Sequence, residues 1–225
     1  MIPVPLRLPH LLEIFFPSLC VLCTTPLDGE KAVCGRCLET LVPTCLGPWL
    51  EETAVREGLD EVWSAFWYDE TMQSLIHLFK YSGHRRVGRR LGGALFHQLE
   101  GEVSWGRFDA LVPVPLHRTK RRERGYNQSA VLARALGGLS GLPVMERLMV
   151  RHRWTRSQTG LSVEERRTNV DGSFRATGPG GGRKVLLVDD MLTTGATASA
   201  CALALKAVGF AEVTVLTVAT PLKEK

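Results

Sequence analysis

The sequence predicts an α/β domain in which a mainly parallel sheet is flanked by helices, with a small cysteine module in front of it. Three successions of strand and helix support this class. An uninterrupted apolar run over 185–188 precedes an Ala-rich helical segment over 198–208, and an apolar run over 109–115 precedes helical spacing over 128–136. An aromatic, strand-like run over 62–68 also leads into a helical segment. This alternation is typical of a parallel sheet with helices on its faces.

The chain is long enough for one main core with a smaller appendage. At 225 residues, we expect an N-terminal module over 1–58 and the α/β domain over 59–225. The formal net charge of +5 is unevenly placed, because residues 80–175 carry 19 Lys and Arg against 8 Asp and Glu. This middle segment must face an anionic partner or tolerate its own repulsion.

The N-terminus shows no secretory or membrane signal. Residues 1–7 lack the basic start of a signal peptide, and Glu13 and Pro17 interrupt the one strongly apolar stretch that follows. No apolar run approaches the length that a transmembrane helix needs. We therefore expect a cytoplasmic protein that does not insert into a membrane.

Four cysteines form two CxxC pairs near the N-terminus, Cys20 with Cys23 and Cys34 with Cys37. Four thiolates on two tight turns match a tetrahedral, structural zinc site with no position left open for chemistry. The loop between the pairs is shorter than in the common zinc ribbons. Disulfides and redox catalysis are the alternatives; a cytoplasmic setting disfavours the first, and the duplication of the motif disfavours the second.

The segment over 62–99 begins with the aromatic run and continues into a helix. The expected core face of that helix consists of Met72, Leu75, Ile76 and Phe79. A turn rich in cations follows over 81–86. Aromatic rings beside arginines can stack nucleobases, although such rings more often belong to the core.

The strand over 109–115 must stop at Pro113 and Pro115, because proline has no N–H to donate to a sheet. We expect a loop over 116–129. It holds five cations within seven positions: Arg118, Lys120, Arg121, Arg122 and Arg124. Such charges repel one another unless an anion lies between them, so pyrophosphate or a nucleic-acid backbone would suit them. The alternative is an ordinary solvated basic surface.

A second basic stretch runs over 151–170. Ser162 and Glu165 have the spacing of a capping box, which predicts a short helix over 163–168. Before it, residues 156–160 show no apolar period. They could form a lid over a phosphate site, or an ordinary surface connection.

An acid pair follows the apolar run over 185–188 directly. Asp189 and Asp190 would emerge at the end of a buried strand, and the loop 193–197 leads into the helix. The helix N-terminus would offer N–H groups to a monophosphate, and Gly195 would allow close approach. The acids suit vicinal ribose hydroxyls, or a magnesium ion reached through water. Acids after strands and Thr at helix caps are each common, but their unbroken order favours a site for a phosphorylated sugar.

These segments together resemble the ComF family, whose members are type I phosphoribosyltransferase-like proteins associated in bacteria with competence and DNA uptake. The resemblance runs nearly from end to end. It rests on the four cysteines, on Phe79-Lys-Tyr-Ser-Gly83, on Val112-Pro-Val-Pro-Leu-His117 with Arg124-Gly-Tyr-Asn-Gln-Ser129, on Thr155 and Gln158 with Arg167 and Asn169, and on Asp-Asp-x-x-Thr-Thr-Gly-x-Thr over 189–197.

The resemblance implies a type I phosphoribosyltransferase-like fold and three functional loops. Residues 114–118 would form the pyrophosphate loop, 151–169 the flexible loop and 189–197 the ribose phosphate loop. The implied ligand is phosphoribosyl pyrophosphate, or a related phosphorylated ribose, with magnesium. The implied catalytic residues are Asp189 and Asp190. The implied ligand-binding residues are Thr193, Thr194, Gly195, Ala196, Thr197, Val114, Pro115, His117, Arg118 and Arg124, and the flexible loop would present Thr155, Gln158, Arg167 and Asn169.

The family is also similar to the transferase half of glutamine amidophosphoribosyltransferase. The glutaminase half of that enzyme needs an N-terminal cysteine nucleophile, whereas residue 2 is Ile, so we expect no glutamine amidotransferase activity. The first functional expectation is binding of phosphoribosyl pyrophosphate, with transfer of the phosphoribosyl group to an acceptor that the sequence does not identify. The second is a non-catalytic module that engages single-stranded DNA or a helicase partner, with a regulatory or vestigial phosphoribosyl site.

Overall fold

The computed structural model describes residues 18–29, 32–44, 54–152 and 172–221. It contains two compact units, Met1–Thr40 and Leu41–Lys225, and each is described by itself. Residues 42 and 43 already pair with the first strand of the second unit, through the bond from Trp67 N to Val42 O and a bridge between Pro43 and Phe66. The domain boundary after residue 58 stays a prediction. Within the described ranges, no helix is long and apolar enough to cross a membrane.

The first unit is a short hairpin followed by one helical turn and a half. Strands β1 (Ser18–Leu19) and β2 (Pro26–Leu27) pair antiparallel, and α2 (Gly35–Glu39) follows. Thr24 adopts a positive φ of 57° in the turn between the strands. A unit this small has few apolar side chains to bury, so a further source of stability is expected.

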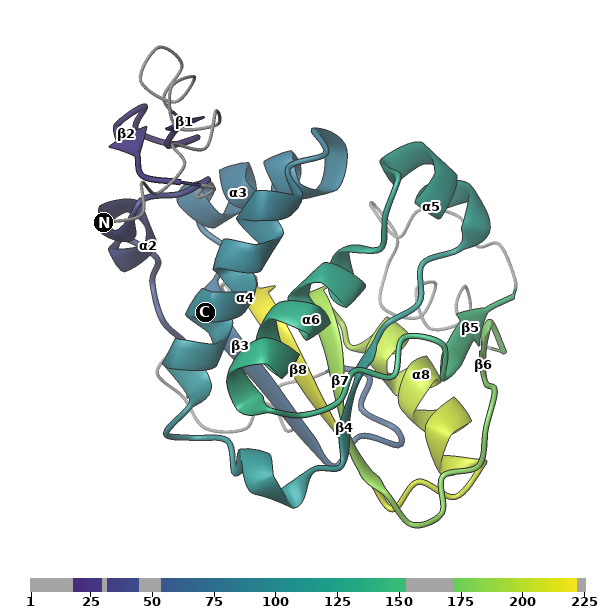
Figure 1. The fold of residues 1–225 in the computed structure, drawn as a ribbon. Helices are drawn as coiled ribbons and strands as arrows, with labels where there is room; N and C mark the ends of the chain where they lie inside the picture. The colour runs from purple at the N-terminus through teal and green to yellow at the C-terminus, as the bar shows by residue number, and fades with distance from the viewer. Residues whose placement is uncertain (1–17, 30–31, 45–53, 153–171, 222–225) are drawn as a thin grey trace, which may run out of the picture. The chain divides into compact units, whose positions relative to one another are not determined.

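The second unit is built on a four-stranded parallel sheet in the order β3-β8-β7-β4 (Figure 1). The strands are β3 (Glu61–Trp67), β4 (Ala110–Pro113), β7 (Lys184–Met191) and β8 (Glu212–Thr220). All three pairings are parallel. The two inner strands are almost wholly buried, as continuous apolar runs in a parallel sheet require. This arrangement confirms the predicted α/β class with a mainly parallel sheet, and the acid pair does follow a buried apolar run.

Helices cover both faces of this sheet. On one face α4 (Arg85–Leu99) and α6 (Gln128–Ser140) contact the strands, and α3 (Glu70–Tyr81) packs against α4. On the other face Val185 and Leu187 share a core cluster with Cys201 and Leu205 of α8 (Ala196–Lys206). A two-stranded antiparallel ribbon, β5 (Met149–Arg151) with β6 (Phe174–Ala176), packs beside α8. The 3₁₀ turn η1 (Trp105–Arg107) precedes β4.

The four side chains predicted to form the core face of the first helix of this unit are all buried, which confirms that prediction. The strand predicted to stop at the prolines does stop at Pro113. The acid-bearing strand runs to Met191, and α8 begins at Ala196, two residues before the predicted start.

The prediction of a loop over 116–129 was wrong, because Arg118–Arg124 form a helix, α5. The ring of His117 accepts a hydrogen bond from Thr119 N at the start of this helix, and Gly125 ends it with a φ of 75°. The ribbon β5–β6 was not predicted either. The predicted helix over 163–168 and the segment 156–160 lie outside the described residues.

Candidate functional site

The candidate site is a cleft of about 520 Å³ at the C-terminal edge of the parallel sheet. Ligands of open α/β sheets bind at this edge, because the loops that follow parallel strands meet there. All four strands contribute to its wall, directly or through the residue that follows them. The lining residues used below are Lys80 and Tyr81 of α3, residues 114–117, Lys120, Arg124, residues 127–129, Arg151, residues 189–193, and residues 195–198.

The acid pair lies in the floor of this cleft. The side-chain oxygen Oδ1 of Asp189 accepts hydrogen bonds from Ser129 Oγ and from Asp190 N, each at 2.9 Å. Burial, and then the neighbouring Asp190 carboxylate, raise the pKa of Asp189 to about 7, although the two hydrogen bonds and Lys80 act in the opposite direction. Asp189 is therefore held in one orientation by its neighbours.

A lysine from another part of the chain pairs with the second acid. Lys80 Nζ lies 2.9 Å from Asp190 Oδ1, and the two side chains are only 18% and 10% exposed. Burial disfavours the ammonium, but the attraction and hydrogen bond of Asp190, with a smaller effect of Asp189, place the pKa of Lys80 above its ordinary value. Lys80 belongs to the segment Phe79-Lys-Tyr-Ser-Gly83, and no role was predicted for it from the sequence. Its position at the end of an amphipathic helix and before Gly83 was the one available signal.

Packing around Phe79 determines where Lys80 lies. Phe79 is fully buried, and its ring lies 5.9 Å from the ring of Tyr126. The Tyr126 hydroxyl donates to Phe79 O, and the Arg85 guanidinium lies 4.8 Å from the centre of the Tyr126 ring. A Cβ at Gly88 would lie 2.2 Å from Phe79 Cε2, so α4 approaches this ring as closely as a glycine allows. The last turn of α3 is thus fixed from two sides.

The loop after the acid pair ends at a helix whose N-cap residue is a glycine. Gly195 is the N-cap residue of α8, has a φ of 85°, and provides no side-chain hydrogen bond to the helix. Thr194 Oγ1 accepts from Ala196 N at 3.4 Å, and Thr194 O accepts from Val55 N at 2.7 Å. Thr193 is exposed, and Thr197 lies in the first turn of α8. The helix N-terminus therefore faces the cleft with the partial positive charge that favours a phosphate.

The segment after β4 forms the facing wall. Val114 N donates to Val188 O at 3.0 Å, which places this segment directly beside the acid pair. Asn127 Nδ2 in turn donates to Val114 O at 3.0 Å. His117 Nδ1 accepts from Thr119 N, so the ring carries its proton on Nε2 when neutral. Burial and the nearby Arg151 and Arg118 lower the pKa of His117, which favours the neutral ring.

Cations and one buried amide complete the wall. The Arg124 guanidinium lies 5.2 Å from the centre of the Tyr81 ring and donates to Gln128 Oε1 at 3.1 Å. Gln128 is 2% exposed, and its Nε2 is buried with no hydrogen-bond partner among the described residues. Arg151, at the end of β5, lies over the Phe174 ring, and burial lowers its pKa.

The structure brings most of the predicted site residues together in this cleft. Those that line it are Asp189, Asp190, Thr193, Gly195, Ala196, Thr197, Val114, Pro115, His117 and Arg124. Thr194 and Arg118 are not among the lining residues. The flexible-loop residues Thr155, Gln158, Arg167 and Asn169 lie outside the described residues. Sequence reasoning missed Lys80, Ser129 and Gln128, which come from helices distant in sequence from the acid pair.

The acid pair is chemically suited to magnesium. Carboxylate oxygens are the hard ligands that this ion prefers, and it is usually held by one or two carboxylates together with substrate phosphates and water. Asp189 and Asp190 each use Oδ1 in the contacts above, and the described residues show no partner for either Oδ2. These two oxygens could therefore accept from ribose hydroxyls or from the water shell of a metal ion.

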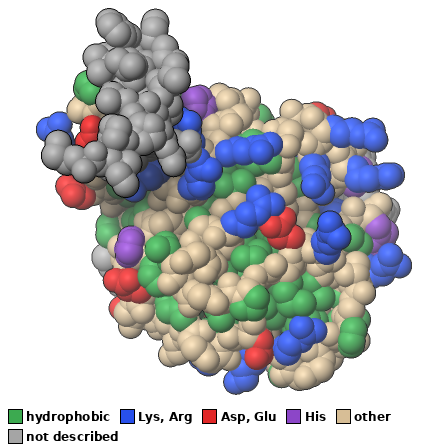
Figure 2. Space-filling view, in the orientation of Figure 1, with side chains coloured by type: hydrophobic (Ala, Val, Ile, Leu, Met, Phe, Trp, Pro, Cys, Tyr) green, Lys and Arg blue, Asp and Glu red, His purple; other side chains and the backbone are tan. Residues whose placement is uncertain are grey.

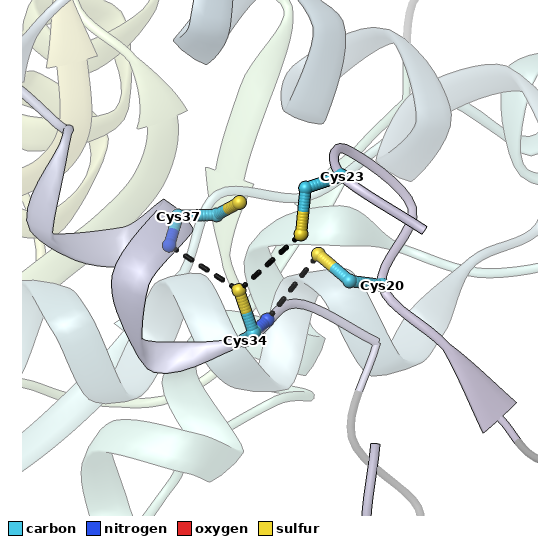
Figure 3. A group of neighbouring side chains, drawn as sticks. All are labelled: Cys20, Cys23, Cys34 and Cys37. Carbon is cyan, nitrogen blue, oxygen red and sulfur yellow. Dashed lines mark hydrogen bonds between the residues drawn. The ribbon is translucent and has the colours of Figure 1, made fainter. Parts of the chain in front are cut away.

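The four cysteines of the first unit form one cluster (Figure 3). Their Sγ atoms all lie within 4.8 Å of one another, and Sγ of Cys23 lies 3.7 Å from Sγ of Cys34. Sulfurs at the corners of a tetrahedral zinc site are separated by about 3.8 Å, given Zn–S bonds of about 2.3 Å. The Cys34 N–H donates to Cys20 Sγ and the Cys37 N–H to Cys34 Sγ, both at 3.4 Å. The donor set and spacing fit zinc.

Charge in the cysteine cluster is unevenly shared. Hydrogen bonds, the largest from the Thr25 hydroxyl, lower the pKa of Cys23 to about 6. Burial and the three neighbouring thiols raise the pKa of Cys37. A cluster of four thiolates therefore requires a cation among them, because the charges otherwise oppose one another.

The chain is similar to a known domain family and to several known proteins. The profile of the phosphoribosyl transferase domain matches residues 123–225. Competence protein F of Haemophilus influenzae is 28% identical over 203 residues, which cover 87% of this chain and 82% of that protein. The DNA utilization protein YhgH of Salmonella typhi is 30% identical over 183 residues, 80% of this chain and 74% of that protein. Competence protein ComFC of Bacillus subtilis is 27% identical over 181 residues, 80% of this chain and 68% of that protein.

Proposed function

Because this chain belongs to the ComF/YhgH family and carries a phosphoribosyltransferase domain, we propose that its cleft binds phosphoribosyl pyrophosphate and that it acts in DNA uptake or utilisation. One observation carries this proposal. A single cleft is lined by an acid pair at the end of a parallel strand, a helix N-terminus whose N-cap is glycine, and a wall of cations. A phosphorylated ribose with a diphosphate at its anomeric carbon needs these three kinds of group.

Each part of the cleft has a role in this proposal. The loop 193–197 and the N-terminus of α8 hold the sugar 5-phosphate. Asp189 and Asp190 accept from the ribose hydroxyls. Lys120 and Arg124, on the opposite wall, face the diphosphate. The cleft volume of about 520 Å³ lies within the range of pockets that hold small ligands.

The same parts suit transfer of the phosphoribosyl group. In that reaction the bond from the anomeric carbon to a pyrophosphate oxygen breaks with both electrons leaving on pyrophosphate, and an acceptor lone pair forms the new bond to that carbon. The acid pair would orient the ribose, and the cations of α5 would stabilise the departing charge. Magnesium, when bound, would neutralise part of the pyrophosphate charge.

Equilibrium binding of radiolabelled phosphoribosyl pyrophosphate in magnesium tests the proposal. Wild type is expected to bind, and Asp189→Asn with Asp190→Asn is expected to lose binding. Asp60→Asn is the matched control, because Asp60 lies at the opposite edge of the sheet, pairs with Lys206, and can keep its bond from Val213 N as an amide. Failure of wild type to bind, or equal binding by the double variant, would show that the site assignment is wrong.

A second candidate function is engagement of single-stranded DNA or a helicase partner, and the exposed basic helix α5 favours it. Arg118, Arg121 and Arg122 of this helix are exposed. Figure 2 shows Lys and Arg side chains gathered on the part of the surface where α5 lies in Figure 1. Oligonucleotide binding that weakens steeply with salt, falls in Arg121→Ala with Arg122→Ala, and survives Asp190→Ala would support it. Binding that is lost in Asp190→Ala would contradict it.

We propose in addition that the four-cysteine cluster holds a structural zinc ion. Since the protein would provide all four ligands, the metal would stabilise the first unit and take no part in chemistry. Metal analysis of purified, reduced protein is expected to give one zinc per chain. A clearly lower content would contradict the four-thiolate assignment.

A further inference from the structure

We propose that Lys80 is the internal counter-ion of the acid pair, and that it prevents a divalent cation from binding the pair until the phosphorylated ligand brings that cation in. Lys80 is thus a positioning residue for the site, acting through Asp190. This inference rests on the proposed function, because the ligand that brings the cation into the cleft is taken to be a phosphoribosyl compound. Its test uses the metal alone.

The first observation behind this inference is the balance of charges in the floor of the cleft. Asp189 and Asp190 are consecutive, and both belong to a buried strand end. Two carboxylates this close repel each other, and an adjacent pair of this kind readily attracts a divalent cation. Lys80 Nζ at 2.9 Å from Asp190 Oδ1 supplies a positive charge of the protein's own at that place. A metal ion that approaches the ligand-free cleft therefore meets one carboxylate that already has a cation beside it, and the ammonium repels the metal ion.

The second observation is that neighbouring residues hold Lys80 in this position. A surface lysine would swing away at little cost and would compete weakly with a metal. Lys80 is 18% exposed and follows Phe79, whose ring is packed against Gly88 and whose carbonyl accepts from the Tyr126 hydroxyl. The side chain also lies in the last turn of α3, where the helix dipole favours a cation.

The other cation close to Lys80 is engaged differently. Arg124 lies over the Tyr81 ring and donates to Gln128 Oε1, on the wall assigned above to the diphosphate. The cleft therefore separates two tasks. Arg124 is placed for the ligand, whereas Lys80 is placed for the protein's own acids. The expected ligand donates its ribose hydroxyls to the acid pair and carries a metal ion on its diphosphate. The diphosphate then provides the additional negative charge that holds the metal ion in the cleft.

Titration of ligand-free protein with Mn²⁺, followed by electron paramagnetic resonance of the free ion, tests this inference. Lys80→Met is expected to bind Mn²⁺ at least about tenfold more tightly than wild type, because a cation next to the acids is gone. Lys80→Arg keeps the charge and is expected to resemble wild type. Lys206→Met is the control, since it removes a lysine that also pairs with an aspartate, Asp60, with 2.6 Å between Nζ and Oδ2, but at a more exposed position that does not line the cleft. Unchanged Mn²⁺ affinity in Lys80→Met would overturn the inference.

A second variant keeps the inference testable if Lys80→Met does not fold. If Lys80→Met is insoluble, Lys80→Met with Asp190→Asn is expected to restore soluble protein, because no unpaired charge remains at either position. Failure of that rescue would overturn the inference. The inference and the proposed function fail separately: wild type that does not bind phosphoribosyl pyrophosphate refutes the function, whereas tighter Mn²⁺ binding by Lys80→Met would still establish the counter-ion.

Discussion

Gly88→Ala is expected to lower both the stability of the protein and the affinity of its cleft for phosphoribosyl pyrophosphate. The added Cβ would lie 2.2 and 2.4 Å from Phe79 Cε2 and Cζ, whereas carbon atoms in contact are separated by about 3.5–4.0 Å. The ring must therefore move by more than an ångström. It cannot move freely, because Phe79 is fully buried and its carbonyl is bonded to Tyr126.

The size of the effect follows from two opposing terms. Overpacking of a well-packed core costs about 1–3 kcal/mol. Replacement of glycine by alanine inside a helix recovers about 1 kcal/mol. We expect a net loss of up to about 2 kcal/mol in the free energy of unfolding, or several degrees in Tm for a chain of this size. Because Lys80 follows Phe79, affinity for phosphoribosyl pyrophosphate is also expected to fall.

Gly93→Ala is the matched control for this experiment. Gly93 lies in the same helix, and a Cβ there would meet nothing within 4 Å. Only the higher helix propensity of alanine then acts, so the free energy of unfolding of this variant is expected to rise by up to about 1 kcal/mol. Urea denaturation followed by circular dichroism measures both variants, and ligand binding is measured in parallel. The reasoning would be refuted if Gly88→Ala were as stable as Gly93→Ala.

Three further changes have defined outcomes. Asp189 has a pKa of about 7 when folded against an ordinary value of 3.8, so the folded state binds the proton more tightly, and the stability this group contributes is lost as pH rises from about 4 through 7. Asp189→Asn removes that loss and is expected to be more stable than wild type at pH 8, with the difference vanishing near pH 4. Equal urea midpoints at pH 8 would contradict this. Tyr126→Phe leaves Phe79 O without its donor and is expected to cost about 1–3 kcal/mol in urea denaturation, and no change would mean that this hydrogen bond contributes little. Cys34→Ser is expected to lower zinc content well below one per chain by metal analysis, whereas full retention would exclude Cys34 as a ligand.

Sequence reasoning succeeded where the signal is local. The acid-bearing strand, the loop after it and the Ala-rich helix are contiguous, so their order could be predicted from Val185 to Lys206 without knowledge of any other segment. The core face of α3 followed from helical spacing. The two CxxC pairs predicted a compact cluster because each pair lies on one turn.

It failed where position depends on packing between distant segments. Lys80 and Asp190 are far apart along the chain, and the packing of α3 against α4 and of Phe79 against Tyr126 brings the lysine to the acid. Ser129 reaches Asp189 in the same way, from the first turn of α6. The ribbon of β5 and β6 pairs segments that each have only three residues, too short for a periodic signal. Helix α5 is dense in like charges, which obscured its helical character.

The position of β8 between β7 and β3 has a consequence for synthesis on the ribosome. β3 emerges early, but its neighbour in the sheet is the last of the described strands to be made, and Glu61 pairs with Thr214. Until then a nascent chain holds β3, most of whose side chains are buried in the finished sheet, without a strand partner. At that stage the lysine-bearing part is joined to the rest by contacts between helices and side chains, such as those of α4 with α6 and of Phe79 with Tyr126. A growing chain of this protein is therefore expected to need chaperone protection until translation has passed residue 220.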